Sequence, residues 1–433
     1  MNLRVRSGTP LCGETRVPGD KSITHRGLLL GALADGPSRL SGYLDGGDCR
    51  ATIGCLRALG VEIEQAAPDQ LLIHGRGLQG WREPEDVLNC VRSGTTMRLL
   101  AGLLAGQPFY SVLSGEAQLR RRPMDRVALP LRQMGAQISG REGGRLPPLT
   151  IQGGALRGIT YELPVASAQV KSCLLLAALY AEGATTVREP APSRDHTERM
   201  LRGRGVEVIS QGNVHTLQGP AEHLAPLDTV VPGDFSSAAF FLVGALLVPG
   251  SEVLLRHVGI NPTRTGLLAV LRQMGAEVAT LDPREEGGEP VADLLVRSQP
   301  LRGVEVGGAT VPLMIDEFPI LALAATQAEG TTRVRDAAEL RVKETDRIAT
   351  IVAALGALGA EIEALPDGFE IRGPTPLRGV AVECYGDHRL AMTLAMAGLV
   401  AEGETTILGA ECIADSFPGF ERCLAALAQG ALA

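Results

Sequence analysis

Lysine is rare in this chain, and each lysine lies among polar residues that could bind or convert an anion. The 41 basic residues include only Lys21, Lys171 and Lys343 as lysines. A buried ammonium can gain or lose its proton, whereas a guanidinium keeps its charge. The general preference for arginine leaves open that three lysines survive by chance. Their placement in polar clusters nevertheless predicts a functional role for at least two of them.

Other clusters of cations, carboxylates and hydroxyl groups stand just before apolar, helix-like stretches. The first turn of a helix exposes unpaired N–H groups and a partial positive charge, which suits a phosphate or a carboxylate. For any single cluster the alternative is ordinary helix capping, or for a run of arginines a solvated face. The clusters cover 21–26, 92–98, 120–122, 167–171, 193–198, 316–317, 343–347 and 386–389.

The elements that would carry these clusters repeat six times. An apolar stretch ending at a glycine occurs at 26–36, 97–106, 171–183, 238–250, 319–330 and 390–403. A second pattern, a leucine followed by glycine and a β-branched residue, predicts a helix, a left-handed glycine cap and a strand. It occurs at 56–63, 131–138, 201–208, 271–278 and 355–362, and the sixth copy ends in a helix near 420–427. These units are longer than solenoid repeats, so we expect six small α/β subdomains.

Two similar hexapeptides predict the domain boundary. The sequence Val-Pro-Gly-Asp at 17–20 returns at 231–234. We expect one domain from residues 19–234 and a second from residues 1–18 and 235–433, with three units in each. Two strands near 18–21 and 232–235 would form a hinge between them. This organisation predicts a two-domain α/β clamshell.

Composition limits the classes of function. The chain has 433 residues, 45% of them apolar and 21% charged, and a net charge of -8. An acidic chain without an aromatic-basic stripe is not expected to bind nucleic acid. The apolar stretch 238–248 is too short to cross a membrane, and no signal sequence opens the chain. Eight cysteines without metal-ligand spacing predict buried, reduced thiols. We therefore expect a cytoplasmic protein, a monomer, without a metal or an organic cofactor.

Taken together, the clusters resemble the 5-enolpyruvylshikimate-3-phosphate synthase (3-phosphoshikimate 1-carboxyvinyltransferase) family from end to end. The resemblance implies the enolpyruvyl transferase fold, an inside-out α/β barrel in which each of two domains has three βαβαββ units. It also implies that the domains close over phosphoenolpyruvate and shikimate 3-phosphate. The matching segments are 19–22, 93–98, 167–171, 194–198, 261–264, 343–347 and 387–389.

The reaction implied by the family is transfer of the enolpyruvyl group to the 5-hydroxyl of shikimate 3-phosphate, with release of phosphate. It belongs to chorismate and aromatic amino acid biosynthesis. The forms Gly-Asp-Lys, Ser-Ala-Gln-x-Lys, Arg-x-His-x-Glu and Asn-x-Thr-Arg look like the subgroup that tolerates glyphosate. Tolerance is a hypothesis that inhibition by low glyphosate at saturating phosphoenolpyruvate would contradict.

The resemblance also implies the substrate contacts, residue by residue. Arginine forks suit the carboxylate and the phosphate of phosphoenolpyruvate, and a glycine lets the backbone approach a ligand. The residues expected to bind phosphoenolpyruvate are Lys21, Gly94, Arg122, Gln169, Arg347 and Arg389. Those expected to bind shikimate 3-phosphate are Lys21, Ser22, Arg26, Ser167, Ala168, Gln169, Arg194, Asp316 and Lys343.

The expected mechanism is addition followed by elimination. Asp316 would take the proton of the 5-hydroxyl, and Glu344, with Lys21 as the alternative, would protonate the methylene carbon. His388 is a further catalytic candidate, although a core histidine is the alternative for it. Cations would neutralise the developing charge, so no cofactor is required.

Two positions depart from the family pattern. Arg92 stands where the family usually has asparagine, and Asp415 lies in a stretch where many relatives carry a lysine. Both changes concern the affinity for phosphoenolpyruvate rather than the type of reaction.

Two other functions remain open from the sequence. The sister enzyme that transfers enolpyruvyl to UDP-N-acetylglucosamine shares the six-unit fold, but it has Lys-Asn where this chain has Lys21-Ser22, and it uses a loop cysteine. A non-catalytic scaffold that keeps only the anion pockets would bind the ligands without turnover.

Overall fold

The computed structural model describes residues 1–432, and the chain divides into two compact units. Unit 1 comprises Met1–Pro18, Pro232–Glu285 and the chain from Pro290 onward. Unit 2 comprises Gly19–Val231 and Glu286–Glu289. Each unit has its own core of buried aliphatic side chains. The two units are described separately below.

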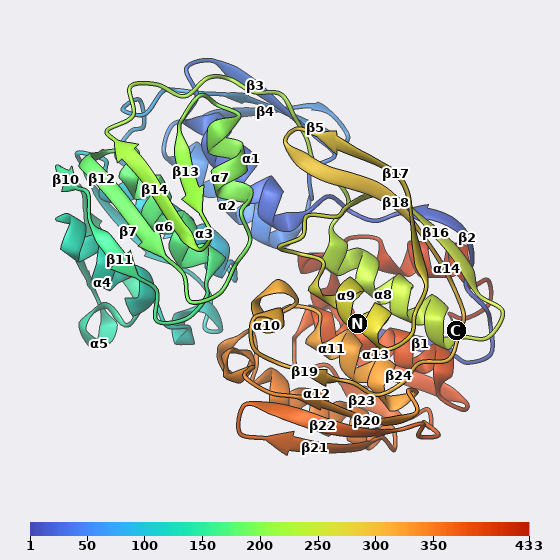
Figure 1. The fold of residues 1–433 in the computed structure, drawn as a ribbon. Helices are drawn as coiled ribbons and strands as arrows, with labels where there is room; N and C mark the ends of the chain where they lie inside the picture. The colour runs from blue at the N-terminus through green and yellow to red at the C-terminus, as the bar shows by residue number, and fades with distance from the viewer. Residues whose placement is uncertain (433) are drawn as a thin grey trace. The chain divides into compact units, whose positions relative to one another are not determined.

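Unit 2 contains three sheets with one strand order (Figure 1). In each sheet a short edge strand runs parallel to its neighbour, and two further strands pair antiparallel. The first sheet is β15 (Thr229–Val230), β3 (Pro37–Ser41), β5 (Gln70–His74) and β4 (Glu62–Ala67). The second is β6 (Leu88–Asn89), β7 (Tyr110–Ser114), β9 (Leu146–Gln152) and β8 (Gln137–Gly140). The third is β10 (Leu156–Arg157), β12 (Ala181–Arg188), β14 (Val214–Gly219) and β13 (Val208–Gln211), with β11 (Thr160–Glu162) also beside β12.

Unit 1 repeats this arrangement. One sheet is β2 (Cys12–Arg16), β16 (Glu252–Gly259), β18 (Glu289–Arg297) and β17 (Val278–Glu286). Another is β19 (Glu305–Val306), β20 (Gly330–Val334), β22 (Gly368–Gly373) and β21 (Glu361–Leu365). The last is β23 (Ala381–Glu383), β24 (Glu404–Leu408) and β1 (Asn2–Arg6). Here β1, from the start of the chain, pairs antiparallel with β24 and completes the sixth repeat.

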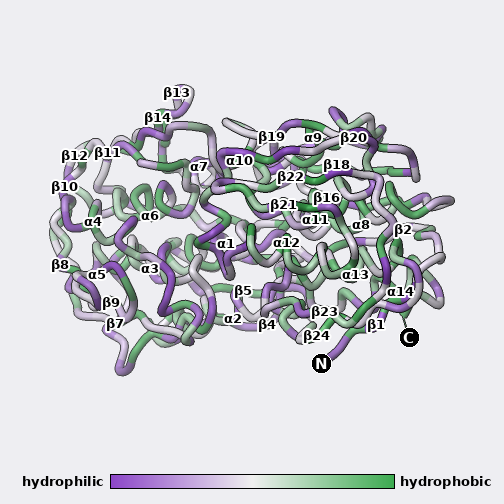
Figure 2. Tube along the Cα trace, turned by 90° about the horizontal axis from the view of Figure 1, so that it is seen from below, coloured by the Kyte–Doolittle hydropathy of each residue, from purple (hydrophilic) through white to green (hydrophobic). Residues whose placement is uncertain are grey.

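The helices fall into two classes that match the two sequence patterns. The inner helices are buried on nearly all sides, as is typical of helices that are apolar all round. They are α1 (Lys21–Ala32), α3 (Gly94–Ala105), α6 (Ala168–Ala178), α8 (Phe235–Leu247), α11 (Phe318–Thr326) and α13 (His388–Val400). Within unit 1, α13 packs against α8 and α11. Figure 2 colours the chain by hydropathy, and apolar residues, drawn in green, recur along these helices.

The outer helices carry the glycine caps. They are α2 (Gly47–Ala58), α4 (Asp125–Met134), α7 (His196–Arg202), α9 (Gly266–Gln273), α12 (Arg347–Ala357) and α14 (Phe420–Leu427). The predicted left-handed glycine follows each of the first five, at Gly60, Gly135, Gly205, Gly275 and Gly359, all with positive φ. The short helical segments are α5 (Arg141–Gly144), α10 (Thr310–Leu313), η1 (Leu119–Arg121), η2 (Ala338–Val342) and η3 (Ala410–Asp415).

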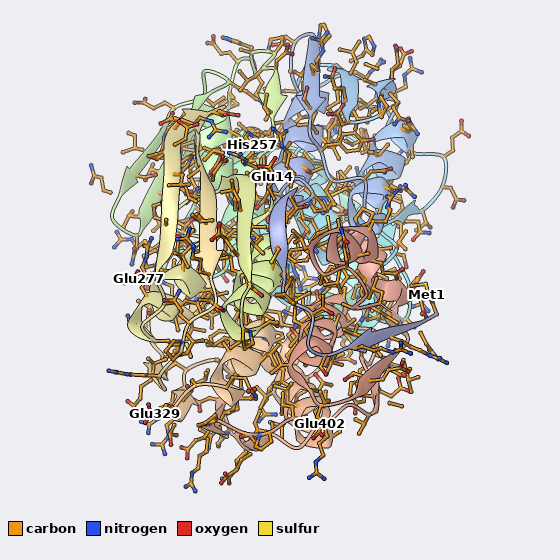
Figure 3. The ribbon with its side chains drawn as sticks, turned by 90° about the vertical axis from the view of Figure 1, so that its right-hand side faces the viewer. Met1, Glu14, His257, Glu277, Glu329 and Glu402 are labelled. Carbon is orange, nitrogen blue, oxygen red and sulfur yellow. The ribbon has the colours of Figure 1, made fainter. Side chains whose placement is uncertain are left out.

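Successive repeats of unit 1 share details of their turns. Glu329 follows α11 and Glu402 follows α13, and each forms an isolated parallel bridge, with Arg302 and Arg378 respectively. Figure 3 shows both glutamates at the same edge of the unit. The sequence repeat is therefore a structural repeat down to single backbone contacts.

Candidate active site

In unit 2, the N-terminal end of α1 gathers several predicted residues. Asp20 caps the helix by accepting a hydrogen bond from the Ile23 N–H at 2.9 Å. Lys21 forms an ion pair of 3.1 Å with Asp48, and both side chains are only partly exposed. The hydroxyl of Ser22 accepts a hydrogen bond from Arg194 at 3.3 Å. Lys21, Ser22 and Arg194 therefore lie together, as the sequence predicts.

Arg26 lies one turn further along α1 and is buried, with 2% of its surface exposed. Its guanidinium donates to the Ser22 carbonyl oxygen at 2.9 Å and to the hydroxyls of Thr197 and Ser172, each at 2.6 Å. Burial lowers the pKa of Arg26 to about 10. The structure thus places Arg26 beneath Ser22, where it supports the backbone of that residue.

A second group of unit 2 surrounds the N-terminal end of α3. A Cβ at Gly94 would meet the guanidinium of Arg122 at 3.0 Å and that of Arg98 at 3.1 Å. Gly94 therefore leaves room for two guanidinium groups, which a side chain would displace. Gln169 joins the group, because it accepts from Arg98 at 2.5 Å and donates to the Thr95 hydroxyl at 2.9 Å.

Neutral hydrogen bonds tie these two groups together. The Nδ1 atom of buried His25 lies 2.7 Å from the hydroxyl of Thr52, which lies 2.7 Å from that of Thr96. Thr96 in turn donates to the cap residue Ser93 at 2.7 Å. Burial lowers the pKa of His25 to about 3, against the weaker opposing effect of Asp48. A neutral chain thus connects α1, α2 and α3.

Lys171 differs from the other two lysines because it is fully buried. Its ammonium lies 2.6 Å from Glu189 and 2.8 Å from Glu198, and Glu189 also contacts His215 at 3.1 Å. Burial alone would raise the pKa of Glu189, but His215 and Lys171 outweigh it and lower this pKa. Lys171 therefore forms a buried ion-pair network inside unit 2. Ser167 and Ala168, at the start of the same helix, are half-buried.

In unit 1, Asp316 lies among arginines contributed by three other segments. Its carboxylate oxygens are 3.3 Å from Arg347, 3.6 Å from Arg389 and 4.0 Å from Arg264. Arg347 begins α12 and Arg389 lies in the first turn of α13. Asp316 itself precedes α11. The structure thus brings three of the predicted residues of this unit within contact of one another.

Arg347 is the centre of this group. It is 1% exposed and forms ion pairs with Glu344 at 2.7 Å and with Asp387 at 2.8 Å, in addition to Asp316. Burial alone would lower the pKa of Arg347, but the carboxylates of Asp387, Glu344 and Asp316 outweigh it and raise this pKa. Burial alone would raise the pKa of Asp387, and Arg347 reverses that effect and lowers it. The guanidinium is thus held by carboxylates on several sides.

Two arginines are placed in these groups although no role was predicted for them. Arg98 contacts Gln169 in unit 2, as described above. Arg264 in unit 1 donates to Asp234 at 2.9 Å and to Ser236 at 2.8 Å. Ser236 also donates to Glu317, whose pKa is raised by burial. Arg98 and Arg264 lie in segments 93–98 and 261–264, which match the family motifs. That match is the sequence signal that could have identified them.

The remaining predicted residues are placed as follows. His388 is the buried first residue of α13, beside Asp387, and Lys343 is half-buried directly after η2. Arg122 is half-buried, whereas Arg120 and Arg121 are exposed. Of the two departures, Arg92 is exposed and pairs with Glu116 at 2.8 Å. Asp415 is half-buried at the end of η3.

The cysteines partly differ from expectation. Within residues 1–432 no disulfide is present, and six of the eight thiols are buried. The prediction of burial is wrong for Cys12, which is exposed at the start of the edge strand β2, and for Cys423, which is half-buried beside Thr15 of the same strand.

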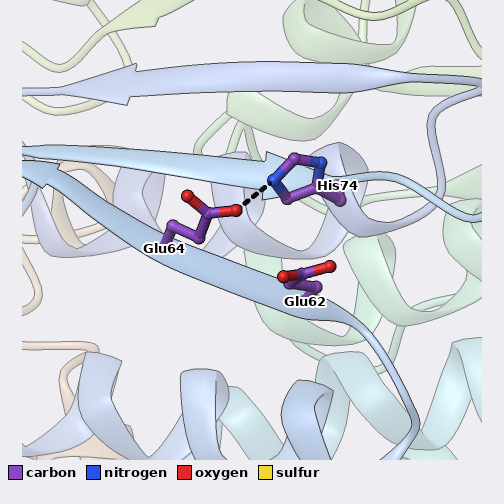
Figure 4. Close-up of side chains that lie close together, drawn as sticks. All are labelled: Glu62, Glu64 and His74. Carbon is purple, nitrogen blue, oxygen red and sulfur yellow. Dashed lines mark hydrogen bonds and ion pairs between the residues drawn. The ribbon is translucent and has the colours of Figure 1, made fainter.

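Polar clusters outside these groups contain none of the predicted residues. Glu62, Glu64 and His74 lie together on the exposed face of β4 and β5, with 2.8 Å between His74 and Glu64 (Figure 4). Their donor atoms lie close enough together to share a cation, but the hydrogen bond between His74 and Glu64 already accounts for the contact. In unit 1, residues of β2, β16, β17 and β18 line an open depression of about 550 Å³, and Glu14 and His257, labelled in Figure 3, are among them. Arg256 is paired there with Glu14 and Asp293.

Six βαβαββ-type repeats in two units, with clusters of charged side chains at the starts of inner helices, are the architecture of the enolpyruvyl transferases. The family model for EPSP synthase (3-phosphoshikimate 1-carboxyvinyltransferase) matches residues 5–424. The chain belongs to this family.

Individual relatives agree with the family match. The chain is 56% identical to the 3-phosphoshikimate 1-carboxyvinyltransferase of Geobacter sulfurreducens, over 98% of both chains. It is 54% identical to that of Citrifermentans bemidjiense, over 99% of both. Among solved structures, an EPSP synthase from Acinetobacter baumannii superposes with a TM-score of 0.88 at 46% identity, covering 99% of this chain and 98% of that one.

These matches confirm the expected two-domain α/β fold and the expected enzyme class. Within residues 1–432, no helix has both the length and the apolar character that a membrane crossing needs.

Proposed function

We propose that this enzyme transfers the enolpyruvyl group of phosphoenolpyruvate to the 5-hydroxyl of shikimate 3-phosphate, and that residues of both units act on this one pair of substrates. The observation that carries the proposal is the arrangement around Asp316. Its carboxylate lies within 4.0 Å of three arginines, and Arg347 also holds Glu344. Two potential proton carriers therefore share one set of anion-binding cations.

Phosphoenolpyruvate would be bound by cations of both units. Arg122 packs over Gly94 in unit 2, and Arg347 and Arg389 flank Asp316 in unit 1. Guanidinium groups form paired, charge-assisted hydrogen bonds with carboxylates and phosphates. The backbone of Gly94, at the start of α3, would add N–H donors. Gln169 and Lys21 complete this set.

Shikimate 3-phosphate would be bound mainly by unit 2. Lys21, Ser22 and Arg194 form the cluster at the start of α1, and Arg26 acts from beneath Ser22. Ser167 and Ala168, at the start of α6, provide a second helix N-terminus for an anion. Lys343 and Asp316 from unit 1 would contact the hydroxyl groups of the shikimate ring.

The proton transfers would be carried out by carboxylates of unit 1, with Lys21 of unit 2 as the alternative proton donor. Asp316 accepts the proton of the 5-hydroxyl as its oxygen attacks C2 of phosphoenolpyruvate. Glu344, or alternatively Lys21, delivers a proton to C3, which gives a tetrahedral ketal. Removal of a proton from the new methyl group expels phosphate and leaves the enolpyruvyl ether. His388 is a further catalytic candidate at the start of α13.

A phosphate-release assay with each acceptor tests this proposal. We expect phosphate release from phosphoenolpyruvate with shikimate 3-phosphate and none with UDP-N-acetylglucosamine. The reverse preference would assign the chain to the sister activity. Binding of both substrates without release of phosphate would identify a scaffold.

Glyphosate tolerance is a finer part of the proposal. It is supported by the motif forms Gly19-Asp20-Lys21, Ser167 to Lys171, Arg194 to Glu198 and Asn261 to Arg264. The prediction is turnover that persists in glyphosate when phosphoenolpyruvate is saturating. Strong inhibition at low glyphosate under those conditions would contradict it.

We further propose a cytoplasmic monomer whose two chain crossings, near 18–21 and 232–235, act as a hinge on substrate binding. Small-angle scattering tests both points. A monomer mass with a smaller radius of gyration in the presence of both substrates is expected, and an unchanged radius would contradict the hinge.

A further inference from the structure

Two cysteines of unit 1 lie in contact beside the start of α13. The Sγ atoms of Cys384 and Cys412 are 3.8 Å apart, and the two residues are 0% and 4% exposed. Cys384 directly follows β23, and Cys412 lies in η3. A disulfide requires an S–S distance of about 2.05 Å, so the two sulfur atoms, now 3.8 Å apart, must approach each other by about 1.75 Å.

Cys384 is joined to the candidate site by a tight turn. Tyr385 and Gly386 follow it, both with positive φ (56° and 69°), and Tyr385 adopts this conformation although it carries a side chain. The next residue, Asp387, donates its N–H to the Cys384 carbonyl oxygen at 2.9 Å. Asp387 then caps α13 through the Arg389 N–H and binds Arg347 at 2.8 Å. A displacement of Cys384 is therefore passed on to both arginines.

We propose that Cys384 and Cys412 form a reversible disulfide when a peroxide oxidises them, and that this disulfide raises the KM for phosphoenolpyruvate. The proposed disulfide itself rests only on the geometry of the two thiols. Its effect on turnover rests on the proposed function.

The chemistry balances with one peroxide per disulfide. The Cys384 thiolate attacks one peroxide oxygen, the O–O bond breaks, and hydroxide leaves, so that Cys384 becomes a sulfenic acid. The sulfur of Cys412 then displaces the hydroxyl group as water and loses its proton. Two thiols and one hydrogen peroxide thus give one disulfide and two waters. A dithiol reductant reverses the change by thiol–disulfide exchange.

The surroundings select Cys384 as the attacking sulfur. The hydrogen bond with Cys412, together with the Gly386 N–H, lowers the pKa of Cys384, whereas the same contact and burial raise the pKa of Cys412. The thiolate is the reactive form of cysteine. Cys90 and Cys55 in unit 2 are also neighbours, but burial raises the pKa of Cys90 well above its ordinary value. Oxidation should therefore favour the pair in unit 1.

The experiment compares reduced and peroxide-treated protein by non-reducing peptide mapping and by steady-state kinetics. We expect a Cys384–Cys412 crosslink, and a KM for phosphoenolpyruvate raised by roughly tenfold, since displacements near 1 Å at a site can cost that much or more. Dithiothreitol should restore the original KM. Cys384→Ser and Cys412→Ser should each abolish the response, and Cys12→Ser and Cys55→Ser should retain it.

The outcomes separate the two parts of the argument. Absence of the crosslink while exposed Cys12 is oxidised would overturn the proposal. So would a complete crosslink with unchanged KM, because the turn would then not transmit the change. If the reduced enzyme releases no phosphate, the proposed function fails, whereas the mapped crosslink still decides whether the thiols react. Should Cys384→Ser not fold, Cys412→Ser provides the same test.

Discussion

The two units hold their clustered cations in different ways. In unit 2, Lys21 begins α1, which a neutral chain from His25 through Thr52 and Thr96 connects to α3, and Gly94 at the start of α3 makes room for guanidinium groups. In unit 1, the central cation Arg347 is surrounded by carboxylates. Unit 2 thus presents donors, and unit 1 combines cations with groups that can carry protons.

This difference predicts a division of labour. A donor-rich surface stabilises bound anions, and a cation packed against carboxylates fixes the positions of an acid and a base. Variants of the cations that would face the substrates should therefore affect mainly substrate affinity, and variants of the carboxylates that unit 1 adds should affect mainly turnover. The predictions below run from the largest expected effect to the smallest.

Asp316→Asn should cause the largest loss. The amide keeps the shape of the carboxylate but cannot accept the hydroxyl proton, so kcat should fall by about 10²- to 10⁴-fold with a smaller change in KM. Steady-state phosphate release measures both constants. Asp282→Asn, at an exposed position of the same unit, is the matched control. A kcat near that of the wild type would remove Asp316 from the reaction.

Arg347→Met and Lys171→Met should both destabilise the protein. Each removes one partner of a buried ion pair, which typically costs about 3–5 kcal/mol of unfolding free energy. Only Arg347→Met should also greatly raise the KM for phosphoenolpyruvate, since the ammonium of Lys171 is fully buried against Glu189 and Glu198. Denaturant unfolding and kinetics separate the two effects. Arg347→Lys and Lys171→Arg keep the charge if a variant does not fold. Equal effects on KM would remove the distinction.

The neutral chain of unit 2 predicts a dependence of stability on pH. The pKa of His25 is about 3 in the folded protein and 6.5 in the unfolded chain. Below pH 6.5 the unfolded chain therefore binds a proton that the folded protein does not, so stability falls as the pH drops from 6.5 toward 3. The slope from this residue approaches 1.4 kcal/mol per pH unit. His25→Gln should reduce the slope of unfolding free energy between pH 4 and 6.5. An unchanged slope would indicate a protonated His25 in the folded state.

Arg92→Ala should have the smallest effect. Arg92 and Glu116 form an exposed ion pair, and such pairs contribute about 0.2–1 kcal/mol. The KM for phosphoenolpyruvate should stay close to that of the wild type. A large rise in this KM would show that Arg92 leaves Glu116 and binds the substrate. Unit 2 would then use a cation that changes its partner on substrate binding, which its structure does not indicate.

Much of this organisation could be predicted from the sequence, because apolar stretches and glycine caps depend on local periodicity. The six inner helices and the left-handed glycines are examples. The pairing of β1 with β24 and of β2 with β16 joins strands far apart in the chain, and no local pattern specifies it. The burial of Arg26 and Lys171 was missed for the same reason. Their partners, Thr197 and Glu198, are supplied by α7, an element that sequence spacing alone does not bring near them.

The most direct test of the central claim is a turnover experiment in D2O with product analysis by proton NMR. If unit 1 delivers a proton to C3 of phosphoenolpyruvate and then removes one, deuterium must appear in the vinyl methylene group of the enolpyruvyl ether, and Glu344→Gln should slow its appearance. A product formed at the wild-type rate without deuterium in that group would contradict addition followed by elimination.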